Sequence, residues 1–305
     1  MESIFLAMQG AVSQGMLWSV MTLGVYITFK VLDYADLTVD GSFATGGAVT
    51  AVLIVNGHNP FISLIFATVA GMLAGMVTGL LHTKLRIPAI LSGILSQLAL
   101  YSINVGIMGQ ANISLLGEKT IFNTTAKAFG GKVSNNSIVL IIGIIFVVAI
   151  IAVMYWFFGT EIGSCIRATG NNEYMVRALG GSTDRMKILG LLISNGLVAL
   201  SGALVAQQQG FGDVSMGIGA IVIALASVII GEVVFGKNHS FWYTLASLVL
   251  GSIIYKIIIA VVLQLGLNTN NLKLLTAAIV ALALSLPVIT EAINGIKKRK
   301  YQEQE

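Results

Sequence analysis

The sequence has few of the residues on which soluble and secreted proteins depend. Charged side chains make up 10% of its 305 residues, whereas a soluble domain has roughly 25%. The single cysteine, Cys165, excludes an internal disulfide and any metal site built on paired cysteines. The first nine residues contain Glu2 and no basic residue, so we expect no cleavable secretion signal. The shortage of charge indicates a protein that lies within a membrane.

Patterns for catalysis and nucleotide binding are also missing. No glycine-rich loop ends in the lysine that cradles phosphates, so we expect any ATP to be bound by a partner and no cofactor in this chain. The three histidines, His58, His82 and His239, are scattered at the ends of apolar runs and predict no metal site. The net charge of +4 is not gathered on one soluble face, so no nucleic-acid partner is expected. We expect a protein that is not an enzyme.

Apolar residues dominate instead. They make up 56% of the chain, and the mean hydropathy is +0.90. The apolar runs approach 20 residues and do not alternate, which favours membrane-spanning helices over the strands of a barrel. We predict an all-α, polytopic transmembrane helical bundle of about 8–10 spans, forming one domain over residues 1–305. The expected spans cover residues 11–31, 43–55, 61–81, 88–108, 137–158, 188–206, 216–235, 241–265 and 272–289. The second and eighth of them are broken or re-entrant in an alternative threading.

The basic residues set the orientation of the bundle. With nine spans, 12 of the 17 basic residues fall on one side of the membrane and four on the other, while Lys256 lies inside a span. Basic residues accumulate on the cytoplasmic side of membrane proteins. We therefore expect the polar loop at 159–187 and the tail at 296–305 in the cytoplasm, and the N-terminus outside a cell membrane that the chain crosses several times.

The loop at 159–187 contains a short amphipathic helix. Asn171 or Asn172 can cap it, Glu173 suits the positive end of its dipole, and Gly180 and Gly181 can end it. Its apolar stripe consists of Tyr174, Met175, Ala178 and Leu179. Such a helix either lies on the membrane surface of its own protein or docks into a partner, and the second interpretation is favoured.

Polar residues within or beside the spans are candidates for a solute pathway, because they are costly in a membrane without a function. Gln97, Tyr101 and Asn104 are four and three residues apart, on one face of a helix. The acidic break at 33–42 supplies the others, and its carboxylates are expected to meet water, a helix N-terminus or a cation. The six pathway candidates are Asp36, Asp40, Ser42, Gln97, Tyr101 and Asn104. Hydrogen bonding between helices is the alternative role.

A loose internal repeat relates the two halves of the chain. The first span, the break at 36–42 and the small-residue span after it recur as the sixth span, the break at 212–217 and the span after that. The two units point in opposite directions in the nine-span threading, as in transporters built from inverted repeats. The alternative is that small residues recur because they pack helices closely.

Four segments are similar to motifs of a transporter family. Residues 36–42, Asp-Leu-Thr-Val-Asp-Gly-Ser, resemble a motif near its second span, although Asp40 interrupts it. Residues 163–180 resemble its cytoplasmic Gly-x-x-x-Arg-Ala…Ala-x-x-x-Gly loop, and 201–204 and 224–231 resemble later Gly-Ala and Ala-x-x-Ile-Gly segments. The chain thus resembles permease subunits of ATP-binding-cassette importers, in the branched-chain amino-acid and ribose branch. It is most similar to a subfamily linked with aromatic amino-acid uptake.

The resemblance implies both a function and partners. It implies import of a small polar solute, an amino acid and in particular an aromatic one, delivered by an extracellular substrate-binding lipoprotein and driven by a cytoplasmic ATP-binding subunit. A second copy of the permease and the lipid bilayer complete the assembly. The residues implied in contact with the ATPase are Arg167, Asn172, Glu173, Tyr174, Met175, Arg177, Ala178, Leu179 and Gly180. An ion-coupled carrier and a permease for a sugar or nucleoside are the alternatives.

Overall fold

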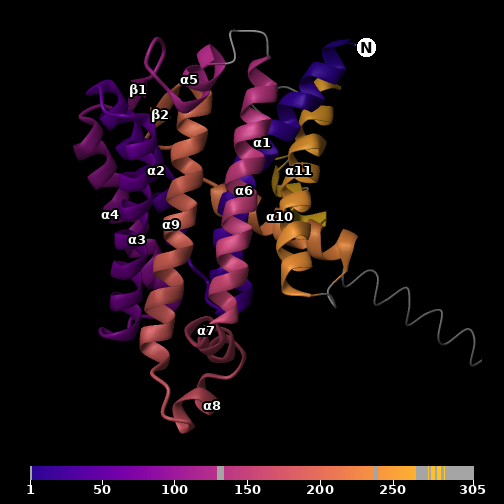
Figure 1. Cartoon of the computed structure of the whole chain (residues 1–305). Coiled ribbons are helices and arrows are strands. Elements are labelled where there is room, and N and C mark those ends of the chain that lie inside the picture. The colour runs from indigo at the N-terminus through magenta and orange to yellow at the C-terminus, as the bar shows by residue number, and fades with distance from the viewer. Residues whose placement is uncertain are drawn as a thin grey trace, which may run out of the picture.

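The structure is a computed structural model that describes residues 2–128, 134–236 and 240–265, together with 274, 276–278, 280–282 and 285. Long helices run side by side in an all-α bundle (Figure 1). The helices are α1 (Glu2–Tyr26), continued by the π-helix η1 (Ile27–Val31), α2 (Thr38–Val55), α3 (Pro60–Thr83), α4 (Ala89–Met108), α5 (Ile121–Ala128), α6 (Asn135–Gly159), α7 (Glu161–Asn171), α8 (Glu173–Ala178), α9 (Thr183–Gln209), α10 (Ala220–Phe235) and α11 (Phe241–Gln264). Two short strands, β1 (Asn112–Ser114) and β2 (Phe211–Asp213), pair antiparallel with Ile113 opposite Gly212.

Seven of the described helices are long and apolar enough to cross a membrane: α1 with η1, α2, α3, α4, α6, α9 and α11. The 16-residue α10 is a shorter apolar helix. The predicted helical bundle is therefore confirmed, and its first eight spans each correspond to a helix. The predicted ninth span, at 272–289, and the tail at 296–305 lie outside the described residues, apart from the isolated positions named above.

Several boundaries and one loop differ from the sequence-based expectation: α1 begins at Glu2 rather than at residue 11, and α10 begins at Ala220 rather than at residue 216. The second and sixth spans begin five residues earlier than predicted, at Thr38 and Thr183. At Thr38 the reason is a side-chain cap, since the Asp36 carboxylate accepts the Thr38 N–H at 2.9 Å. The polar loop after α4 was expected to be irregular, but it contains β1 and α5. The pairing of β1 with β2, about 100 residues later, is a tertiary contact that local sequence does not reveal.

The helix α9 is the centre of the packing and lies against α1, α2 and α3. Gly71 and Gly75 of α3 let the two backbones approach, because a Cβ at Gly71 would overlap Ala199 and one at Gly75 would overlap the Leu191 carbonyl oxygen. One turn further along, a Cβ at Gly79 would lie 3.0 Å from Ile188. This face, with a glycine at every fourth residue, holds α3 against α9.

The two ends of the bundle differ. Figure 1 shows the N-terminus, α5 and the β1–β2 pair at one end and α7 and α8 at the other. The charge bias that predicts the N-terminus outside also predicts α7 and α8 inside, and the structure separates these segments accordingly. The candidate residues for partner contact, on α7 and α8, therefore lie at the end of the bundle opposite the N-terminus.

Candidate coupling surface and solute pathway

The first part of the polar loop forms α7, which the sequence analysis did not anticipate. Thr160 caps it, its hydroxyl oxygen accepting the Gly163 N–H at 3.3 Å. Near its other end α7 lies directly against η1, since a Cβ at Gly170 would overlap the Val31 carbonyl oxygen. Arg167, one of the implied ATPase contacts, is exposed, and its guanidinium carbon lies 5.6 Å from the centre of the Phe241 ring. α7 thus connects the loop at 159–187 to the end of the first span.

The predicted amphipathic helix is confirmed as α8. Asn172 is its cap and accepts the Met175 N–H at 3.0 Å, while Gly180 follows its end with a φ of 81°. Gly181, also expected to end it, is not among the glycines of positive φ in the described residues. The apolar stripe is exposed rather than packed on the protein's own surface, with Tyr174 84% and Leu179 80% exposed.

A different residue attaches α8 to the rest of the protein. Val176 is 5% exposed, and it points the opposite way from the stripe. A Cβ at Gly181 would lie 2.6 Å from the Val176 side chain, so the turn after α8 packs closely on it. The stripe pattern did not predict this contact, because Val176 falls between the stripe positions. The stripe is consequently free to meet another surface.

Glu173 fixes the orientation of α8 relative to α9. One carboxylate oxygen pairs with the Arg177 guanidinium at 2.5 Å and accepts from the Thr183 hydroxyl at 3.2 Å, and the other pairs with the Lys187 ammonium at 2.8 Å. Partial burial raises the pKa of Glu173, but the hydrogen bond and charge of Lys187, together with Arg177 and Thr183, outweigh it and lower the pKa overall. Glu173 therefore stays ionised and acts within the chain, although it was expected among the ATPase contacts.

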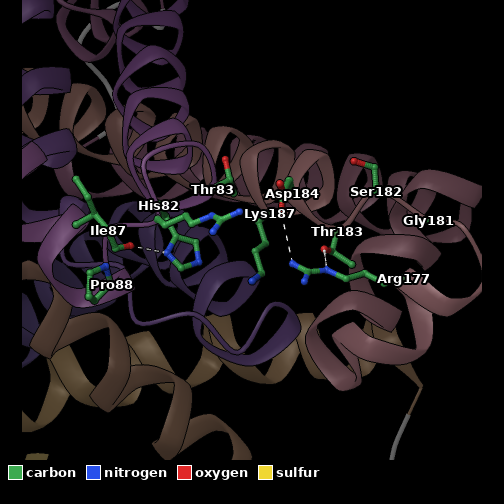
Figure 2. A pocket seen from close by; sticks show the side chains of 11 residues that line it. His82, Thr83, Ile87, Pro88, Arg177, Gly181, Ser182, Thr183, Asp184 and Lys187 are labelled. Carbon is green, nitrogen blue, oxygen red and sulfur yellow. Dashed lines mark hydrogen bonds and ion pairs between the residues drawn. The ribbon is translucent and has the colours of Figure 1, made fainter.

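A cleft of about 580 Å³ separates α8 from the turn between α3 and α4. Figure 2 shows Arg177 reaching from α8 toward Thr183 and Asp184 at the start of α9, with His82 of α3 bonded to Ile87. Arg86, which has a left-handed φ of 57°, also lines the cleft. At Arg177, α8 therefore borders a polar cleft, whereas its outer stripe is apolar.

The pathway candidates divide into two groups. Four of the six line one cavity of about 130 Å³ between α2, α4 and the segment before α10: Asp40, Gln97, Tyr101 and Asn104. Val214 and Ile218 form its apolar wall on the other side. The spacing on α4 predicted that three of these side chains share a face, and the structure adds Asp40 from a different helix.

Asp40 connects two helices. It lies in the first turn of α2, and its two carboxylate oxygens accept the N–H groups of Gly219 and Ile221, each at 2.9 Å. These groups belong to the N-terminus of α10, where the helix dipole favours a negative charge. The expected meeting of an acid with a helix N-terminus is thus found at Asp40. The starts of α2 and α10, the helices after the two breaks of the suggested repeat, meet at this carboxylate.

The other two candidates, Asp36 and Ser42, belong to a separate buried network centred on Asn195 of α9. The Asn195 amide donates to Asp36 at 2.7 Å, and its oxygen accepts from the Ser42 hydroxyl at 2.6 Å. Asp36 is only 3% exposed and Ser42 is fully buried. Burial raises the pKa of Asp36, against the opposing effect of the hydrogen bonds from Thr38 and Asn195. This network holds α2 against α9.

Asn104 has a property that no other pathway candidate shares. It is fully buried, and neither atom of its amide group has a hydrogen-bond partner among the described residues. Buried amides are almost always paired, because an unpaired one loses its bonds to water without compensation. Asn104 lines the 130 Å³ cavity, so the unused hydrogen-bonding capacity is located at that cavity.

Two functional candidates were absent from the sequence-based set. Asn195 is a polar residue inside a span, and the rule that selected Gln97 would have selected it too. Glu232 of α10 forms an ion pair with Lys30 of η1 at 3.0 Å, and only the fold brings these two residues together. The pair joins the end of the first span, against which α7 packs, to α10.

The described residues form a bundle of long apolar helices, with an exposed apolar stripe on α8 at one end and an internal cavity lined by four of the six pathway candidates. Residues 7–285 match the family model of the branched-chain amino acid transport system permease component, and the chain belongs to this family. This family match confirms the resemblance inferred from the motifs, which is to permease subunits of ATP-binding-cassette importers. The protein is accordingly a transport subunit of the cell membrane.

Individual relatives differ in what they are named for. The chain is 42% identical over 276 residues to a tyrosine transport system permease protein of Clostridioides difficile, covering 90% of each chain. It is 34% identical over 278 residues to an uncharacterized protein of Rickettsia prowazekii, covering 90% of this chain and 95% of the relative. An autoinducer 2 import system permease protein of Yersinia pestis is 33% identical over 195 residues, or 63% of this chain and 53% of the relative.

Proposed function

We propose that this chain is the permease of an importer for amino acids, aromatic ones in particular, which a binding protein delivers from outside. The single observation that carries the docking part of the proposal is the exposed apolar stripe of α8, held in place by Glu173 and Val176. A six-residue helix is not stable alone in water, so a stripe kept exposed on it needs a partner surface. A cytoplasmic ATPase is the partner proposed.

The ATPase contact is proposed to act through α7 and α9. Force applied to α8 reaches α9 through the Glu173–Lys187 ion pair and reaches the end of the first span through α7 at Gly170. The residues proposed for this contact or its support are Arg167, Asn172, Glu173, Tyr174, Met175, Arg177, Ala178, Leu179 and Gly180. Tyr174 and Leu179 are the anchors, because large exposed apolar side chains contribute most at interfaces.

An aromatic amino acid is the proposed substrate. The 42% identical tyrosine transport permease supports this choice, and the more distant autoinducer 2 permease shows that relatives are named for other solutes. A sugar or nucleoside is the competing substrate. The pathway is proposed to pass Asp40, Gln97, Tyr101 and Asn104, with Asp36 and Ser42 supporting it from the Asn195 network. A pair of identical permeases is proposed, because each chain carries one α8 and a paired ATPase offers two docking clefts.

The test is uptake by proteoliposomes that contain this chain with the ATPase and binding protein encoded nearest to it. We expect ATP-dependent accumulation of tyrosine, lost when the Walker lysine of the ATPase is replaced, and a complex mass that fits two permease copies. Accumulation that survives the Walker substitution and collapses with an ionophore would identify an ion-coupled carrier instead. Accumulation of a sugar but of no amino acid would overturn the substrate.

A further inference from the structure

The cavity of about 130 Å³ beside Asn104 is close in size to an aromatic ring. An engineered protein cavity of roughly 150 Å³ binds benzene. The walls here are mostly apolar and include Ala44, Leu98, Val214 and Ile218. Ligand sites commonly combine such apolar walls with a few placed polar groups that determine orientation. The dimensions and lining therefore suit a ring that carries a polar substituent.

Asn104 provides the polar group with spare capacity. Its amide nitrogen and oxygen are buried and unpaired among the described residues, so it can donate one hydrogen bond and accept another. The Asp40 carboxylate in the same cavity is already engaged by the N–H groups of Gly219 and Ile221. Asp40 therefore does not compete for the Asn104 amide, which remains available to a ligand.

The cavity is also reachable from the surface of α4. Leu98 is 64% exposed and Tyr101 is 52% exposed, and both line the cavity. The cavity therefore borders the exposed face of α4 at these two side chains. The opposite wall, at Val214 and Ile218, belongs to the segment that Asp40 ties to α2. The cavity thus lies between parts of the bundle that belong to its two halves.

We propose that this cavity receives the ring of an aromatic substrate in transit and that Asn104 recognises a hydroxyl on that ring. A phenolic hydroxyl can donate to the Asn104 oxygen and accept from its nitrogen, which satisfies both atoms at once. A ring without the hydroxyl leaves both unpaired, and buried polar groups left unpaired are the strongest means of rejecting an analogue. Asn104 is thereby a specificity-determining residue for tyrosine over phenylalanine. The inference rests on the proposed amino-acid import.

The experiment compares tyrosine and phenylalanine transport by the complete transporter in proteoliposomes. The binding protein is supplied in excess and saturated with each amino acid, so that the ratio of maximal rates reports the permease rather than delivery. Asn104→Leu replaces the amide with an apolar side chain of similar size. We expect the tyrosine-to-phenylalanine ratio of maximal rates to fall about tenfold, because the hydrogen bonds to the hydroxyl are lost.

The matched control is Thr50→Val. Thr50 is also fully buried with an unpaired hydroxyl, but it does not line this cavity, so the ratio should stay at the wild-type value. If Asn104→Leu lowers both rates equally and leaves their ratio unchanged, its defect is purely structural and the inference is overturned. Tyrosine uptake by the wild type would still uphold the proposed function. Wild-type transport of neither amino acid would overturn both. If Asn104→Leu does not reach the membrane, the ratio of maximal rates is measured instead with Asn104→Ala, which has a smaller side chain.

Discussion

Two carboxylates near the start of α2, Asp36 and Asp40, each hold the start of a helix, and this explains why both are tolerated at this place in a membrane protein. Asp36 accepts the first N–H of α2, and Asp40 accepts two N–H groups at the start of α10. Each of these hydrogen bonds favours the charged form of its carboxylate, although burial opposes this effect and raises the pKa of Asp36. The two acids therefore have different roles, because Asp36 stabilises the start of α2 and Asp40 connects α2 to α10.

Asp36→Asn should destabilise the fold by about 1–3 kcal/mol, since it places an amide N–H₂ against a second hydrogen-bond donor. The donor is either the Thr38 N–H or the Asn195 amide, depending on how the new side chain turns. A lower unfolding temperature of the purified protein in detergent would record the effect. Asp33→Asn is the control, because Asp33 is exposed and asparagine accepts its left-handed φ of 51°. Equal unfolding temperatures of the two variants would contradict the prediction.

Glu173→Gln should loosen α8 and lower stability by about 1 kcal/mol or less, because the lost ion pairs with Arg177 and Lys187 are partly exposed. The pKa of Glu173 is lowered in the folded protein from its ordinary value of 4.5. Its contribution is therefore complete above that value and is lost as the pH falls through the lower, folded pKa.

The corresponding measurement is the difference in unfolding temperature between wild type and Glu173→Gln as a function of pH. The difference should be constant at neutral pH and should shrink only below about pH 4.5. Arg185→Gln is a suitable control, because Arg185 is exposed and its charge lies next to the same region. A difference that shrinks between pH 8 and pH 6 would mean that another group titrates.

At the scale of elements, the loop at 159–187 consists of two helices with different surroundings. α8 presents an apolar stripe outward, and α7 lies against η1 at the end of the first span. π-helical turns inside α-helices occur frequently at functional sites. The Lys30–Glu232 ion pair joins η1 to α10, so a displacement of α7 has a direct route to the helix that Asp40 ties to α2.

Gly170→Ala should therefore reduce transport without removing the ATPase. A Cβ at this position overlaps the Val31 carbonyl oxygen, so α7 must move away from η1 while α8 keeps its own contacts. We expect a several-fold lower uptake rate, with normal co-purification of the ATPase. Gly159→Ala is the matched control, because no atom lies within 4 Å of a Cβ there. If both variants transport equally well, the contact between α7 and η1 is not part of the coupling route.

Sequence patterns predicted the elements whose ends are determined by nearby residues. They did not predict the elements that depend on contacts with residues far away in the sequence. The cap at Asn172 and the glycine at 180 lie within a few residues of α8, so that helix was predictable. α7 was not predicted, because glycines such as Gly163 and Gly170 disfavour a helix. In the fold they make room for the backbones at Phe157 and Val31, respectively. η1 likewise has no signature within its own apolar sequence.

At the scale of the whole molecule, the same distinction applies to the pathway. Gln97, Tyr101 and Asn104 were recognised because their spacing places them on one face of α4. Their meeting with Asp40 depends on contacts between α2, α4 and the start of α10, and the distance of 179 residues between Asp40 and Gly219 has no local signal. Asp36 and Ser42 were grouped with them by sequence proximity, although their hydrogen bonds lead to α9.

The two ends of the molecule offer exposed leucines that make a matched pair for a final prediction. Leu179 follows α8 and is 80% exposed, and Leu116 lies in the loop after β1, at the opposite end, and is 84% exposed. Leu179→Asp should weaken ATPase binding at least tenfold, because it places a charge within the apolar anchor of the interface. Leu116→Asp should leave ATPase binding unchanged, because it changes the other end of the bundle.

The measurement is the amount of ATPase that co-purifies with equal amounts of each permease variant, followed by substrate-stimulated ATP hydrolysis in proteoliposomes. Both substitutions replace an exposed leucine with aspartate, so general effects on insertion or solubility should be alike. We expect Leu179→Asp to lose both signals and Leu116→Asp to retain the first. Equal recovery of the ATPase with both variants would show that the stripe on α8 is not its docking site, because the charge would then have entered no interface.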